Sequence, residues 1–182
     1  MPGFYDVNAL QKIAINLFYG WGYNFYRAEN QLRADDQFVR RKAEELLARA
    51  CECVVRAESE FRRVHFPTPT RANPYPSSEA VTGAQSLERL AASINALKAR
   101  VNSQPVPEAD RMTQRYREEG ATLARLIACD EQLVGQSELL RSSLDEKDDA
   151  WILENLGLLR EGVKAMAETL EQRADLISGS IV

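Results

Sequence analysis

Residues 36–65 read DQFVRRKAEELLARACECVVRAESEFRRVH. Apolar side chains recur in this stretch at steps of three or four, which keeps them on one face of an α-helix. The preceding Asp35, or Asp36 itself, stands where an N-cap residue is expected, and Pro67 cannot continue the helix. The stretch therefore predicts a long helix whose core stripe is Val39, Ala43, Leu46, Ala50, Cys53, Ala57, Phe61 and Val64.

Similar spacing extends along the chain in both directions. It predicts further helices over 7–34, 79–101, 108–142 and 145–178, with a proline-rich loop over 66–78. We expect the last helix to open at a capping box formed by Ser143 and Glu146, within an acidic run. Its core stripe is Ile152, Leu156, Leu159, Val163, Met166, Leu170 and Ile177. The short polar joints favour an all-α antiparallel bundle of four to five long helices, in a single domain over 1–182.

Composition and charge support a globular chain. The 182 residues are 45% hydrophobic and 27% charged, which is typical of a folded domain and not of a disordered one. Residues 1–101 carry a net charge of +3 and residues 102–182 a net charge of −7. The two halves are expected to complement each other across the bundle, or else the basic half faces an acidic partner.

The location of the protein is inferred from its thiols and its polar residues. Three cysteines and an opening Met1-Pro2-Gly3 without basic residues favour reduced thiols and a cytoplasmic protein. The most apolar early stretch, 9–26, contains too many polar side chains for a membrane span. An excess of arginine over lysine, 18 to 5, suggests a bacterial source.

The first predicted helix is unusually aromatic, with eight of the fourteen aromatic residues in the first 26 positions. We consider three explanations: a helix wedged between two bundle partners, an interface with a protein partner or a second copy, and a small-molecule pocket lined by rings. Two adjoining faces of the helix supply the candidate interface residues, which are Phe18, Trp21 and Phe25 on one face and Tyr19, Tyr23 and Tyr26 on the other.

The sequence lacks the residues that common catalytic bundles need. Its one histidine excludes a carboxylate-bridged di-metal site of the Glu-x-x-His type, and His65 is expected to compensate the dipole at a helix end. Cys51 and Cys53 lie about 200° apart around a helix and cannot bind one ion together, so we expect one buried and one flanking thiol. We predict no catalytic residue, no metal site and no cofactor.

Asp130 is the polar residue that needs an explanation. It falls between Leu126 and Leu133, near the inward edge of the predicted third long segment. A carboxylate buried there requires an arginine or tyrosine partner. We expect structural pairing, and a functional role for Asp130 stays open.

These observations favour a non-catalytic interaction or assembly protein, such as an adaptor, a chaperone or a structural subunit, that uses the aromatic first helix to bind a protein partner or a second copy. The alternative is a small-ligand binder or an enzyme with an aromatic pocket near Trp21 and Tyr23. A third hypothesis, nucleic-acid binding, is weaker because the chain has no dense basic surface. It would use the arginines of the second helix, Arg40, Arg41, Arg62 and Arg63.

Overall fold

The computed structural model describes residues 3–20, 32–71, 74–104 and 120–178. The described residues form helices and no strand, which confirms the predicted all-α helical bundle. The helices are α1 (Val7–Gly20), α2 (Leu32–His65), α3 (Ser78–Asn102), α5 (Gly120–Leu144), α6 (Asp149–Glu154) and α7 (Leu156–Ser178).

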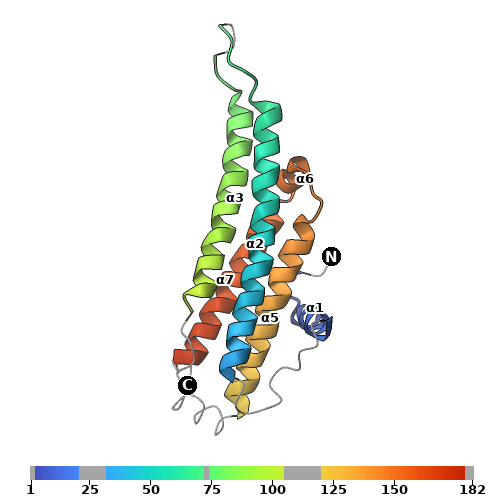
Figure 1. The fold of residues 1–182 in the computed structure, drawn as a ribbon, viewed down its shortest axis with the longest axis vertical. Coiled ribbons are helices and arrows are strands. Elements are labelled where there is room, and N and C mark those ends of the chain that lie inside the picture. Colours follow the sequence, from blue (N-terminus) through green and yellow to red (C-terminus); the bar gives the residue numbers. More distant parts are fainter. Residues whose placement is uncertain (1–2, 21–31, 72–73, 105–119, 179–182) are drawn as a thin grey trace.

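Four long helices form a closed ring. α2 packs against α3 and α5, and α7 packs against the same two helices. Consecutive long helices run antiparallel, and the α2–α3 hairpin projects beyond the other helices at one end (Figure 1). The ring encloses a core whose fully buried side chains include Leu47, Leu87, Ile94, Leu133, Leu140, Leu159 and Met166.

The predicted core stripe of α2 differs from the buried face of the helix at two positions. Val54 is fully buried, whereas Cys53 is half-buried and Val64 is 58% exposed. The buried face of α2 is broad because two helices cover it. Near the end of the projecting hairpin that cover is reduced, so Val64 faces water although its spacing fits the stripe (Figure 1).

The first helix does not continue into the second. α1 lies across the long axis of the bundle beside α5, whereas α2 runs along that axis (Figure 1). The prediction of one helix over 7–34 is therefore wrong: residues 32–34 belong to α2, and residues 21–31 lie outside the described part of the chain. The N-cap prediction for Asp35 and Asp36 is also wrong, because α2 already begins at Leu32.

The junction between α5 and α6 also differs from the prediction. Ser143 is buried inside α5, where its hydroxyl donates a hydrogen bond to the Leu139 carbonyl oxygen at 2.6 Å, so it caps no following helix. Glu146 adopts a left-handed backbone with φ of 54° in the turn. Asp148 is the N-cap residue of α6, and its side chain accepts a hydrogen bond from the Trp151 amide at 2.9 Å. The predicted capping box is therefore wrong by several residues.

The predicted helix over 145–178 is two helices with a break at Asn155. The side-chain amide of Asn155 donates to the Trp151 carbonyl oxygen at 2.9 Å, and its backbone N–H donates to the same oxygen at 3.0 Å. An asparagine that binds its own preceding turn in this way competes with regular helix geometry. The apolar spacing continues across the break, which is why the pattern alone does not reveal it.

A buried ion-pair cluster joins α2, α5 and α7. Arg173 is fully buried on α7, and its Nε lies 2.7 Å from Oδ1 of Asp130 on α5. Its Nη2 binds Asp36 on α2, and the second carboxylate oxygen of Asp36 lies 2.6 Å from Nη2 of Arg40. The expectation that Asp130 is buried and paired with an arginine is confirmed. Among the described residues of the cluster, two arginines and two aspartates balance, which offsets the cost of burying charge.

Candidate interaction site

α1 is seated on α5 by a close approach of the two backbones. A Cβ atom added at Gly135 of α5 would overlap the carbonyl oxygen of Leu10, so only glycine lets α1 come this near. The ring of Phe4, which precedes α1, occupies the equivalent space above Gly162 of α7. Leu10 and Phe4 are both buried, and together they anchor the segment before and within α1 to two helices of the ring.

Three hydrogen bonds hold the same segment. The buried amide of Gln136 donates to the carbonyl oxygen of Phe4 at 3.0 Å. The Tyr5 hydroxyl donates to Glu168 on α7 at 3.1 Å, and the Gln11 amide donates to Glu131 on α5 at 2.9 Å. The position of α1 is therefore fixed by polar contacts at its edges as well as by the glycine contacts beneath it.

The outer side of α1 is poor in charge for a water-facing surface. Lys12 is the one charged residue among the fourteen residues of the helix. Val7 is 52% exposed and Ile15 is 38% exposed, and neighbouring Tyr5 is 48% exposed. Depletion of charge together with exposed apolar and aromatic side chains is typical of protein interfaces. Val7 and Ile15 were not among the predicted interface residues, although the near absence of charge over residues 7–20 was a signal for them.

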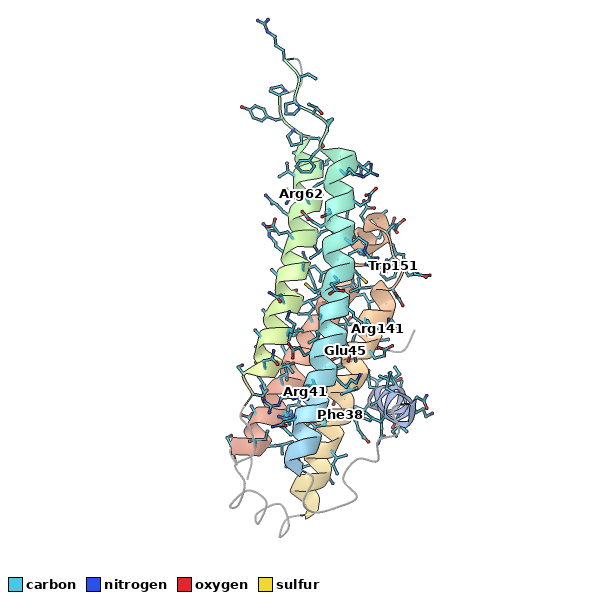
Figure 2. All side chains as sticks on the ribbon, in the orientation of Figure 1. Phe38, Arg41, Glu45, Arg62, Arg141 and Trp151 are labelled. Carbon is cyan, nitrogen blue, oxygen red and sulfur yellow. The ribbon has the colours of Figure 1, made fainter. Side chains whose placement is uncertain are left out.

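The predicted interface residues are only partly described. Phe18 is buried, and its ring centroid lies 6.4 Å from that of Phe38 on α2, which Figure 2 labels beside α1. Tyr19 belongs to α1, but its side chain lies outside the described residues, as do Trp21, Tyr23, Phe25 and Tyr26. α1 packs chiefly on α5 and lies outside the ring, and Phe18 also brings it beside Phe38 of α2.

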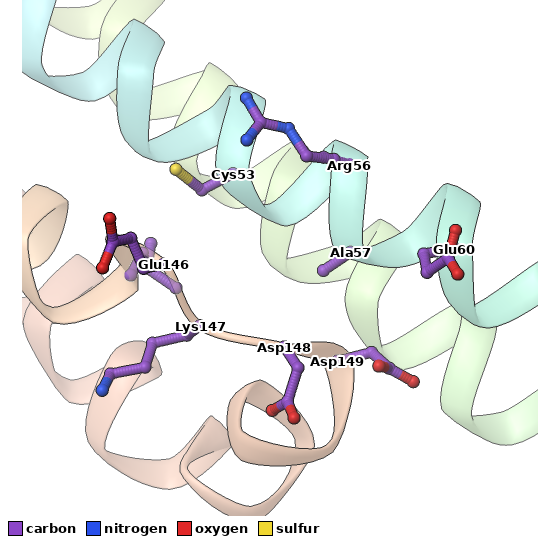
Figure 3. A pocket seen from close by; sticks show the side chains of 9 residues that line it. Cys53, Arg56, Ala57, Glu60, Glu146, Lys147, Asp148 and Asp149 are labelled. Atoms are coloured by element: carbon purple, nitrogen blue, oxygen red, sulfur yellow. The ribbon is translucent and has the colours of Figure 1, made fainter.

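A cavity of about 320 Å³ lies between α2 and the turn from α5 to α6. Cys53 and Ala57 project into it from α2 (Figure 3), and burial raises the pKa of the Cys53 thiol. A raised pKa keeps the thiol protonated, which is the opposite of what a nucleophilic cysteine needs. The rim mixes four carboxylates with two cations and favours no single ligand charge; it consists of Arg56, Glu60, Glu146, Lys147, Asp148 and Asp149.

The arginines considered for nucleic-acid binding are mostly paired within the chain. Arg40 binds Asp36 and donates to the carbonyl oxygen of Gln104 at 3.0 Å. Glutamates neutralise Arg62 and Arg63, namely Glu58 and Glu88 for the first and Glu60 for the second. Arg41 is exposed but lies far from Arg62 along α2 (Figure 2). These four residues therefore do not form a continuous row of free cations.

The thiols differ in one respect from the expectation. Cys51 and Cys53 are both half-buried, rather than one buried and one flanking, because the broad buried face of α2 reaches both sides of Val54. The Cys51 thiol lies 3.6 Å from the carbonyl oxygen of Ala91 on α3. His65, the last residue of α2, stacks on Phe61 with ring centroids 4.4 Å apart.

The described part of the chain contains no group of three or more His, Cys, Asp or Glu side chains placed to hold a metal ion. Nor does it contain a helix with the length and apolar character needed to cross a bilayer. Comparison with protein-family models, with curated proteins and with solved structures gives no match.

Proposed function

We propose that this chain is a non-catalytic interaction or assembly protein of the cytoplasm, and that α1 with the residues just before it is its docking element. The main support for this proposal is one side of α1 that is exposed to solvent, carries little charge and lies on the outside of the bundle. The ring of α2, α3, α5 and α7 closes without α1, so α1 is placed on the ring as an addition. The aromatic residues that follow in sequence are expected to extend the same interface.

The rigid seating of α1 supports this proposal. Gly135 and Gly162 leave room for Leu10 and Phe4 to pack directly against α5 and α7. The exposed side of α1 is therefore held in one fixed orientation. A preorganised surface loses little conformational freedom on binding, which favours affinity. The cavity beside Cys53 and Ala57 does not bear on this proposal, because it offers neither an activated nucleophile nor a dominant charge.

Site-specific photo-crosslinking tests the proposal. A photoreactive amino acid replaces Asn16, which is exposed on α1, and in a control protein it replaces Arg89, which is exposed on α3. We expect a discrete adduct with a second protein chain from position 16 and none from position 89. The adduct should disappear when Ile15→Asp is added, whereas Val64→Asp, at an exposed apolar residue of similar type on α2, should leave it intact. Equal labelling from both positions would contradict the proposal.

A further inference from the structure

One stripe of α1 combines two exposed apolar residues with an amide between them. Val7, Gln11 and Ile15 follow one another at steps of four, so they lie along one side of the helix. Gln11 is exposed and reaches Glu131 of α5, which places this stripe at the edge where α1 meets α5. A further helix that packs against α1 next to α5 would contact this stripe.

Two opposite charges beside this stripe have no ionic partner among the residues that the structure describes. Lys12 is exposed, and no carboxylate among the described residues pairs with it. Glu131 is half-buried and accepts the Gln11 amide, but no cation among those residues pairs with it either. Burial raises the pKa of Glu131, with a smaller contribution from the nearby Asp130 charge. A half-buried carboxylate in this position gains from a cation supplied by another molecule.

Lys12 cannot easily serve Glu131 of its own chain. Successive residues of an α-helix are about 100° apart around its axis, so Lys12 lies on a different side of α1 from Gln11, which meets Glu131. The geometry differs for a second α1 that lies parallel to the first. The two copies are then related by a two-fold axis that runs parallel to both helices. This arrangement turns the lysine of each copy toward the α5 of the other copy.

We propose that a second copy of this chain docks on the Val7–Gln11–Ile15 stripe, with the two α1 helices parallel and Lys12 of each copy paired with Glu131 of the other. The inference rests on the proposed function, since it uses α1 as the docking element. The arrangement brings equal residues together: valine meets valine, isoleucine meets isoleucine, and the Gln11 amides face each other, where each can both donate and accept a hydrogen bond. Lys12 is the single charged residue within α1, and the two lysines point to opposite sides of the helix pair.

Charge reversal tests the pairing. The oligomeric state of the full chain is measured by sedimentation equilibrium over a wide concentration range. Wild type is expected to dimerise, and Lys12→Glu or Glu131→Lys alone should each weaken the dimer by at least about tenfold, because like charges then face each other. The double variant Lys12→Glu/Glu131→Lys should restore dimerisation. Arg89→Glu on α3 is the matched control and should change nothing.

A second variant guards against a folding defect at the half-buried position. Glu131→Gln keeps an acceptor for the Gln11 amide and removes only the charge, so it should fold as wild type and still weaken the dimer. A wild-type monomer at all concentrations would overturn the inference, as would a dimer that tolerates Lys12→Glu or a double variant that stays dissociated. If wild type is monomeric but position 16 crosslinks to a different protein, the proposed function stands and only this inference fails.

Discussion

Arg173 Nε on α7 lies 2.7 Å from Asp130 Oδ1 on α5, and both residues are almost completely closed to solvent. Burial alone would lower the pKa of Arg173, but Asp130 and Asp36 raise it above its ordinary value, so the guanidinium stays charged inside the core. The cluster therefore holds three helices in register through ionic contacts that water does not screen.

Removal of Arg173 should destabilise the fold strongly. Arg173→Met leaves Asp130 buried without its arginine, so we expect a loss of about 3–5 kcal/mol in the free energy of unfolding. Urea denaturation followed by circular dichroism measures it. The matched control is Lys164→Met on the same helix, since the Lys164–Glu168 pair is exposed, at 3.7 Å, and worth less than about 1 kcal/mol. Equal effects of the two substitutions would show that the buried cluster is not stabilising.

Gly135→Ala should loosen α1 and leave the ring folded. The added methyl group overlaps the backbone oxygen of Leu10, which cannot move by a change of rotamer, so we expect a cost of about 1–3 kcal/mol. Hydrogen exchange should rise over residues 7–20 and remain unchanged in α3. Gly157→Ala is the control, because a Cβ there meets open space; in a helix it should be neutral or stabilising by up to about 1 kcal/mol. Unchanged exchange in α1 would mean that Gly135 does not seat it.

The helices of this bundle are predictable because their apolar spacing is regular, and the pairing of Asp130 is predictable because a buried carboxylate needs a counter-charge. The arginine that pairs with Asp130 is not predictable, because Arg173 interrupts an apolar stripe and resembles a surface residue in the sequence. The α5–α6 turn was missed because Ser143 and Glu146 fit a capping box by spacing alone. The crosswise course of α1 depends on Gly135, a residue on another helix, and no local pattern contains that information.

Glu146→Gly should stabilise the protein. Glu146 has φ of 54°, a left-handed conformation that costs a residue with a side chain about 1–2 kcal/mol and costs glycine almost nothing. The greater freedom of glycine in the unfolded chain offsets part of this gain, so we expect a net increase of about 0.5–1 kcal/mol in the free energy of unfolding. Thermal unfolding measures it. Glu146→Ala separates the causes, because it removes the same charge but keeps the strain and should not stabilise.

Alkylation of the three cysteines tests whether the cavity beside α2 has catalytic potential. Burial raises the pKa of the Cys51, Cys53 and Cys129 thiols above that of a free cysteine, so each holds less thiolate at a given pH. At about pH 8 we expect iodoacetamide to label all three more slowly in the folded protein than in urea, because the thiolate is the reactive form. Cys129 should be the slowest, since it is only 9% exposed. The rates should rise with pH beyond the point at which the urea-unfolded control levels off.

Peptide mass spectrometry resolves the three sites. Labelling of Cys53 in the folded protein as fast as in urea would contradict this prediction, and labelling faster than in urea would mean that a neighbouring cation such as Arg56 or Lys147 activates the thiol.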